Sequence, residues 1–165
     1  MKDFLVELFH NYANLILFVH VLSAIIWVGG MFTIRYAVHP AMQHIEDPKV
    51  RLARTLEILK SFFEVLKYVV LLSLLSAIVL IVGLNFKGGD PYLQTIVYVK
   101  EAIWVAMAIV FSIACMRRNR AEKLFISGDL AGTKKYLSTL PSILVPLNIA
   151  LGLMALYLGG TLRGF

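Results

Sequence analysis

The sequence predicts an all-α integral membrane protein, a bundle of four membrane-spanning helices in one domain. Its composition is the first reason: mean hydropathy is +0.80, and 59% of the 165 residues are hydrophobic, more than a soluble domain normally holds. The second reason is run length, because crossing a hydrocarbon core of about 30 Å takes roughly 20 mostly apolar residues in one helix. The stretches that qualify are residues 15–34, 68–84, 96–116 and 140–158.

The four helices are expected at about residues 12–38, 49–85, 92–118 and 138–161 of a single transmembrane domain, 1–165. The first apolar run is of spanning length and follows a mixed segment, which favours a retained helix over a cleavable signal peptide. His39-Pro40 predicts a break after it, because the residue before a proline avoids helical geometry. The second helix opens with an apolar stripe at helical spacing, formed by Leu52, Leu56, Leu59 and Phe63. This stripe predicts an amphipathic cytoplasmic extension.

The remaining connections contain turn signals. Lys87-Gly88-Gly89-Asp90-Pro91 predicts the turn between the second and third helices. Ser127-Gly128-Asp129 is expected to open a short helical piece before the last span. Pro146 lies within the last helix and is expected to kink it.

Basic residues are concentrated in two of the three connections between the helices. Short loops rich in Lys and Arg stay in the cytoplasm, which predicts that both ends of the chain lie outside. The protein is therefore expected in a bacterial-type inner (cytoplasmic) membrane, with the lipid bilayer as its main partner. A nucleic-acid partner is not expected, because these residues flank spans and no aromatic reading surface accompanies them. The two basic groups are Arg35, Lys49, Arg51, Arg54, Lys60 and Lys67, and then Arg117, Arg118, Arg120, Lys123, Lys134 and Lys135.

His20 is the first candidate functional residue, because ionisable side chains inside a span are costly and usually functional. It lies about six residues below the outer start of its helix, which is roughly 8 Å of depth at 1.5 Å per residue. Ser23, Trp27 and Met31 share its helical face. A neutral imidazole with small neighbours suits an axial ligand of haem iron. The alternative is a histidine that hydrogen-bonds between helices, with Ser23 as a local partner.

Lys100 and Asn148 are the other polar residues inside predicted spans. Residues 102–116 alone would measure only about 22 Å, so the third span must extend outward and places Lys100 about 4–5 Å inside the membrane. Lys100 is expected either to meet an anionic partner in the outer half or to snorkel to the surface. Asn148 shares a face with the small residues Gly152, Ala155 and Gly159. That face favours close helix packing over ligand binding and also makes a homodimer plausible.

Copper transport is the competing hypothesis, since His and Met both bind copper. Its candidate ligands are His20, His39 and Met31, although the six methionines form no ladder at helical spacing. His39 lies 19 residues beyond His20, about 28 Å along a helix, so the two cannot share one metal within that helix. A third hypothesis is a cofactor-free structural membrane subunit, whose polar residues only join helices.

Residues 20–39, HVLSAIIWVGGMFTIRYAVH, resemble the first helix of HemJ-type membrane proteins and of the CopD copper-resistance domain, which share a His followed by a Trp-x-Gly-like stretch. HemJ-type proteins are protoporphyrinogen oxidases, reported to bind haem. Arg35, His39 and Lys100 look like further positions of their pattern. The Arg-x-x-Asn-Glu-x-Pro motif of their fourth helix is absent, and only Pro146-Leu147-Asn148 echoes it.

The resemblance implies a redox protein that binds b-type haem or a related porphyrin and transfers electrons or oxidises a porphyrinogen. His20 would be the axial ligand, and a second ligand would come from His10, Met31, Lys100 or another subunit. Lys100 and Arg35 would neutralise the porphyrin carboxylates. Trp27, Ser23 and Asn148 would complete the pocket.

Overall fold

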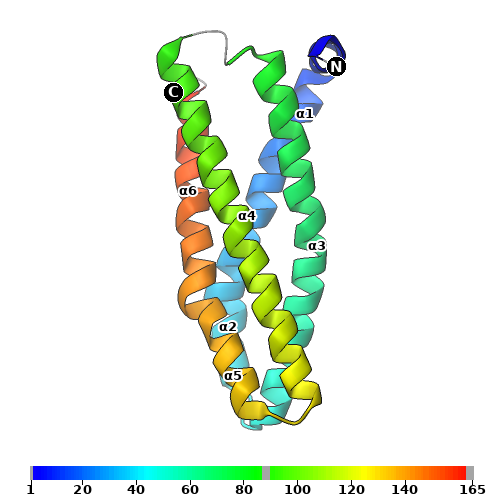
Figure 1. Ribbon diagram of the computed structural model, residues 1–165, viewed down its shortest axis with the longest axis vertical. Coiled ribbons are helices and arrows are strands. Elements are labelled where there is room, and N and C mark those ends of the chain that lie inside the picture. Colours follow the sequence, from blue (N-terminus) through cyan, green and yellow to red (C-terminus); the bar gives the residue numbers. More distant parts are fainter. Residues whose placement is uncertain (1, 87–89, 163–165) are drawn as a thin grey trace.

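The computed structural model describes residues 2–86 and 90–162, and in these ranges every regular element is helical. Four helical rods lie side by side as one elongated bundle (Figure 1), and each is long and apolar enough to cross a membrane. This confirms the all-helical prediction with four apolar helices of spanning length. Lys87, Gly88 and Gly89 of the predicted turn, and the basic Arg163, lie outside the described residues. The elements are α1 (Lys2–Thr33), η1 (Ile34–Val38), α2 (His39–Gln43), α3 (Pro48–Gly83), α4 (Pro91–Ile126), α5 (Leu130–Thr139), η2 (Leu140–Leu144) and α6 (Val145–Thr161).

Aspartates start three of the helices. The Asp47 carboxylate accepts from the backbone N–H of Lys49 at 2.7 Å at the start of α3, and Asp90 and Asp129 accept at 2.8 Å at the starts of α4 and α5. A side-chain oxygen at this position satisfies an N–H that the first helical turn leaves without a partner. Prolines follow two of these aspartates, where their missing N–H and fixed φ suit a first helical residue.

Two π-helical turns, η1 and η2, keep the first and last rods continuous where proline interrupts the sequence pattern. Val38 ends η1 and Leu144 ends η2, in each case two residues before a proline, Pro40 or Pro146. Proline lacks an N–H and its ring clashes with the carbonyl four residues earlier, and the wider turn relieves both problems. The first rod therefore continues to Gln43 instead of breaking at His39-Pro40. The short helical piece α5 likewise runs on through η2 into α6.

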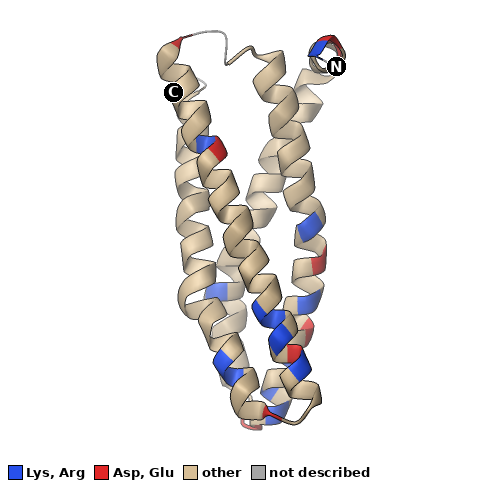
Figure 2. Cartoon of the chain, viewed as in Figure 1, with Lys and Arg blue, Asp and Glu red and all other residues tan. Residues whose placement is uncertain are grey.

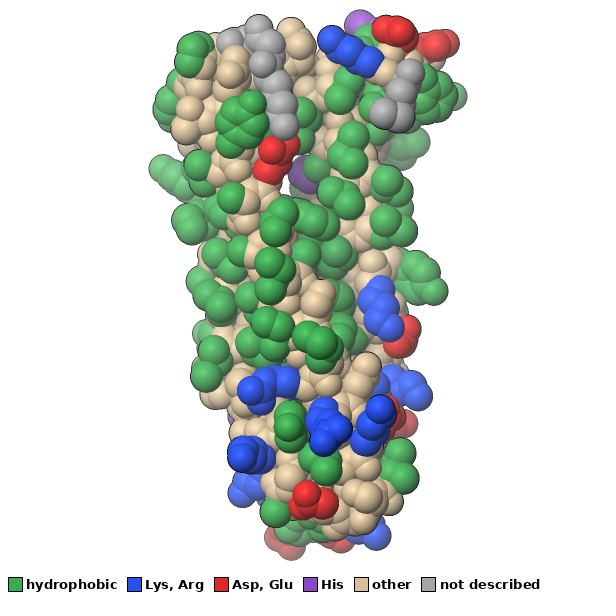
Figure 3. All heavy atoms as spheres, in the orientation of Figure 1, with side chains coloured by type: hydrophobic (Ala, Val, Ile, Leu, Met, Phe, Trp, Pro, Cys, Tyr) green, Lys and Arg blue, Asp and Glu red, His purple; other side chains and the backbone are tan. Residues whose placement is uncertain are grey.

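On the face shown in Figure 3, the surface of the bundle is apolar along most of its length. Phe18, Leu75, Ile109 and Leu153 come from four different helices, and each is more than half exposed. Soluble monomers rarely expose large contiguous apolar patches. An apolar surface of this kind is suited to contact with lipid. The packing thus agrees with the run lengths in making this a multi-pass membrane protein.

The two ends of the bundle differ in charge. α1 begins and α6 ends at the same end (Figure 1), here called the terminal end. Lys and Arg gather toward the opposite end, here called the basic end (Figure 2). The basic residues on the long helices there include Arg51 on α3 and Arg117 and Arg118 on α4.

Aromatic side chains join three helices in the middle of the core. The Trp27 ring of α1 packs edge-on against Trp104 and Phe111 of α4, with both centroid distances 6.4 Å. Phe111 in turn meets Phe63 of α3 at 5.4 Å, again edge-on. Aromatic rings prefer this arrangement, because the positive edge of one ring faces the negative face of the next.

The small-residue face of α6 packs inside this bundle. A Cβ placed on Gly152 would overlap Val28 of α1 and stand 3.2 Å from Cε of Met107 on α4. Glycine therefore sets how closely the three helices approach. The face that suggested a homodimer is occupied within the chain.

Replacing Gly152 with alanine should lower the thermal unfolding temperature in detergent, at a cost of about 1–3 kcal/mol for overpacking. Gly160→Ala is the matched control, since a Cβ at Gly160 of the same helix meets no atom within 4 Å. Differential scanning fluorimetry with the native tryptophans would compare the variants. Equal unfolding temperatures for both would show that α6 is not seated against α1 in this way.

Candidate functional site

His20 is held across the α1–α3 contact by Ser76. The Ser76 hydroxyl oxygen lies 2.7 Å from the carbonyl of Leu72, to which it donates, and 3.1 Å from Nδ1 of His20. A hydroxyl has one proton to give, so this oxygen accepts from Nδ1–H of His20. In that arrangement the proton of His20 is on Nδ1, and the lone pair of the ring is on Nε2.

Lys100 enters the same half of the bundle from α4. Its Nζ lies 2.9 Å from the point where a Cβ on Gly159 of α6 would stand. No acidic partner of Lys100 occurs among the described residues. His20, Ser76 and Lys100 are called the His–Lys cluster below, and with Gly159 all four rods contribute to it.

Ser23 and Trp27 continue the His20 face toward the basic end. Ser23 is buried, and its hydroxyl donates to the carbonyl of Val19 at 2.7 Å. Trp27 is only 2% exposed, and its indole N–H has no acceptor within the described ranges. Met31 follows at 1% exposure. Trp27 and Met31 are therefore core residues, while Ser23 lies one turn from His20.

Asn148 ties α6 to α4. Its Nδ2 donates to the backbone carbonyl of Met107 at 3.1 Å, and the side chain is 1% exposed. Its Oδ1 is buried without a donor in residues 2–86 and 90–162. The bond to a main-chain carbonyl is a helix-packing contact, and it lies in the core with Trp27.

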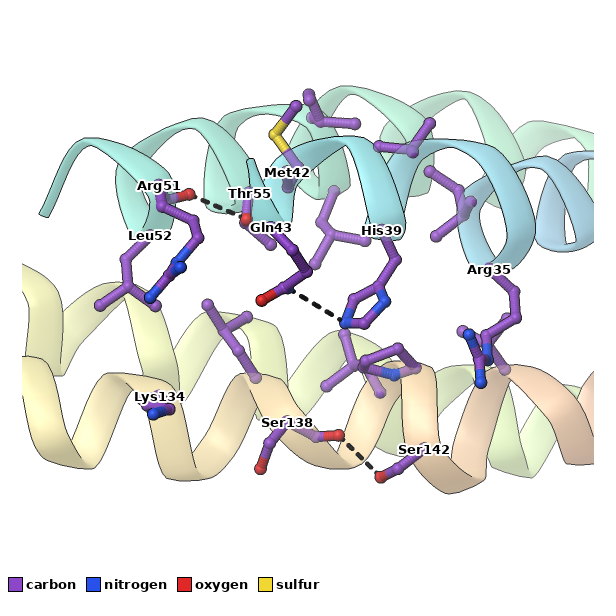
Figure 4. A pocket seen from close by; sticks show the side chains of 18 of the residues that line it. Arg35, His39, Met42, Gln43, Arg51, Leu52, Thr55, Lys134, Ser138 and Ser142 are labelled. Atoms are coloured by element: carbon purple, nitrogen blue, oxygen red, sulfur yellow. Dashed lines mark hydrogen bonds between the residues drawn. The ribbon is translucent and has the colours of Figure 1, made fainter. Parts of the chain in front are cut away.

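Arg35 and His39 line a cavity at the basic end, together with Arg51 and Lys134 (Figure 4). The cavity measures about 610 Å³, within the size range of small-molecule pockets. Arg35 follows His20 by 15 residues, roughly 22 Å along the helix. A porphyrin on His20 would therefore not reach Arg35 with its carboxylates.

The structure does not gather the copper candidates. With the first rod continuous, His20 and His39 remain about 28 Å apart, and Met31 is buried in the core between them. The described part of the chain holds no group of three or more His, Cys, Asp or Glu side chains that could bind a metal ion. A copper ion would meet one of the proposed ligands at a time.

Three residues of these sites were missed by sequence reasoning. Ser76 is a hydroxyl inside an apolar run, which was a visible signal, but its pairing with His20 depends on how α1 and α3 align. In the sequence, Arg51 and Lys134 look like ordinary basic residues of the connections between spans. Only the packing of α2 and α5 against α3 places them around one cavity.

Lys100→Met should raise the free energy of unfolding, by less than the roughly 3 kcal/mol that a lysine at the centre of a span costs, because Lys100 lies nearer the membrane surface. Methionine keeps the length of the side chain and removes the charge. Lys123→Met on the same helix is the control and should have little effect, because Lys123 is exposed at the basic end. Chemical unfolding in mixed micelles measures both, and a less stable Lys100→Met protein would show that Lys100 holds the bundle together.

Comparisons with protein-family models, curated proteins and solved structures found no match for this chain. The likeness of residues 20–39 to the HemJ-type and CopD families therefore stays a prediction. What is known of the site comes from its own geometry.

Proposed function

We propose that this protein binds b-type haem or a related tetrapyrrole in the membrane, with Nε2 of His20 as the axial ligand. The observation that carries the proposal is the Ser76 hydroxyl, which occupies Nδ1 of His20 and leaves Nε2 free. Metal-binding histidines characteristically have their other ring nitrogen held by such a partner, which fixes the tautomer and the ring orientation. The donor set of the His–Lys cluster thus fits this group.

Lys100 supports the proposal by its charge. A cation deep in a span needs a counter-charge, and a tetrapyrrole carries carboxylates that would supply it. Lys100 then either neutralises a carboxylate or acts as the second axial ligand. Ser23, one turn from His20, is the small neighbour of the imidazole in this proposal, while Arg35 lies too far away to take part.

A bound haem would supply one-electron transfer, which suits an electron carrier or an oxidase acting on a porphyrinogen. The protein's own contribution is to position the imidazole, to balance charge at Lys100 and to exclude water. The aromatic core between the His–Lys cluster and the basic end provides that exclusion, because Trp27 and its ring neighbours close the bundle.

His20→Ala should abolish the haem absorption spectrum of the purified protein, both oxidised and dithionite-reduced, because it removes the proposed ligand. His44→Ala is the matched control and should keep the spectrum, since His44 is exposed and bonds only to the carbonyl of Pro40 in its own segment. Lys100→Met should weaken haem binding without moving the bands if Lys100 neutralises a carboxylate. Shifted bands would instead make Lys100 an axial ligand.

Two outcomes would overturn the haem proposal. A wild-type protein that stays colourless after haem is supplied would leave copper transport or a purely structural role, and titration with Cu(I) would separate these two. A haem spectrum that survives in His20→Ala would place the ligand elsewhere in the chain.

We infer that the basic end faces the cytoplasm and that both ends of the chain face outward from a bacterial-type cytoplasmic membrane. The gathering of Lys and Arg at one end supports this orientation. α3 and α4 have 36 residues each, about 54 Å at helical rise, so each exceeds the hydrocarbon core by about 24 Å. The first turns of α3, with their charged outer face, would then project into the cytoplasm as an amphipathic extension.

Single cysteines in a Cys115→Ser background test this orientation. Asp3→Cys near the start of α1 should react with a membrane-impermeant maleimide in intact spheroplasts. Ser127→Cys, exposed in the turn between α4 and α5, should react only after permeabilisation. The reverse labelling pattern would contradict the proposed orientation.

A further inference from the structure

We propose that the cavity at the basic end is a binding site for an acidic phospholipid from the adjacent membrane leaflet. Arg35, Arg51 and Lys134 would hold its phosphate-bearing headgroup, and the apolar wall would hold the start of an acyl chain. This inference does not rest on haem binding, because the cavity and the His–Lys cluster lie in different halves of the bundle.

The cavity lies between the first and last rods, with α3 completing its wall (Figure 4). His39 and Gln43 project into it from α2, while the hydroxyls of Ser138 and Ser142 on α5 and η2 donate to carbonyls of their own helix (Figure 4). Apolar side chains make up much of the remaining lining, among them Ile34, Val38, Leu52, Leu59, Leu137 and Leu140. The site thus combines an apolar wall with hydrogen-bonding groups, as an amphipathic ligand requires.

The charge of the cavity is not compensated. Arg35, Arg51 and Lys134 line it together with His39, and its lining includes no Asp or Glu. Nε of Arg35 is buried without an acceptor among the described residues, and the Arg51 guanidinium donates to the carbonyl of Ile45 over a long 3.5 Å. A ligand with anionic oxygens would satisfy these donors.

Neighbouring basic residues outside the cavity either have an acidic partner or do not line the cavity. Arg54, one turn from Arg51 on α3, forms an ion pair with Glu57 at 2.7 Å. Lys49 and Lys135 lie next to cavity elements in sequence but are absent from its lining. The basic residues that line the cavity can therefore be separated from the other basic residues at this end. Lys49, Arg54 and Lys135 serve as controls for them.

The depth of the cavity favours a lipid over a water-soluble anion. The apolar run 15–34 measures about 30 Å at helical rise, the thickness of the hydrocarbon core. Arg35 directly follows this run and so lies at the hydrocarbon boundary. The cavity extends from Arg35 away from the membrane centre to Arg51 and Lys134, which is the level of lipid headgroups. Basic pockets at this level between membrane helices suit anionic headgroups.

Both π-turns form part of the cavity. η1 contributes Ile34, Arg35 and Val38, and η2 contributes Leu140 and Pro141. The proline-induced widening of each rod thus occurs where the rods line this space. π-turns inside helices are frequent at functional sites, which agrees with a ligand here.

The test compares two triple variants with the same net charge, in neutral detergent with defined lipid added. The cavity variant is Arg35→Gln, Arg51→Gln and Lys134→Gln, and the control is Lys49→Gln, Arg54→Gln and Lys135→Gln. Native mass spectrometry and the ligand-dependent rise in unfolding temperature measure binding of phosphatidylglycerol, with phosphatidylcholine as the neutral lipid. Phosphatidylglycerol should bind wild type and control alike and the cavity variant about a hundredfold more weakly, given about fivefold for each of the three lost cations.

A fourth protein tests whether a loss of binding in the cavity variant could come from misfolding. Ser138→Trp fills the cavity from an exposed position of α5 and leaves the charge unchanged, and it should also lose phosphatidylglycerol binding. Equal loss in the control triple would overturn the proposal in favour of diffuse headgroup attraction. If glycerol phosphate or inorganic phosphate raised the unfolding temperature as much as phosphatidylglycerol does, the ligand would be a water-soluble anion, and the lipid proposal would be overturned. Binding that survives in Ser138→Trp, or equal binding of phosphatidylcholine, would also overturn it.

Discussion

The lack of water inside a bilayer is the constraint on which the rest of this structure depends. Every polar atom within the spans must find a partner in the protein, and the described core contains few polar side chains. The hydroxyl of Ser76 serves both Leu72 and His20, and the amide of Asn148 reaches a main-chain carbonyl of α4. Because so few polar groups are admitted, the buried Nε of Arg35, which has no acceptor among the described residues, marks a place where a ligand would be stabilised.

The helical bundle itself could be predicted from sequence because its signals are local. Run length and hydropathy are properties of consecutive residues, and the bilayer fixes the length that a span must have. The break expected at His39-Pro40 shows where local reasoning fails. The residue preference before proline is real, but a π-turn keeps the rod helical at little cost, and no property of the two residues alone reveals which outcome packs better.

The candidate sites were less predictable because they depend on alignment between helices. His20 and Lys100 stood out as costly residues in the same half of the predicted spans, but the contacts of His20 with Ser76 and of Lys100 with Gly159 follow from how the helices pack. Arg35 and Lys100 were expected to serve one cofactor, whereas the continuous first rod puts Arg35 at the other end. Arg51 and Lys134 carry no signal that separates them from Arg54 or Lys135, since all are basic residues near a span.

The π-turn before Pro40 has a consequence for how this chain can change over time. A π-turn behaves as an α-helical turn with one residue inserted, and each residue turns an α-helix by about 100°. Deleting a residue from η1 would rotate everything after it relative to α1 and restore the clash of the Pro40 ring with the preceding turn. Pro40 and the extra residue of η1 are therefore expected to be kept or lost together during evolution. Losing one without the other would change the alignment between the two halves of the first helix.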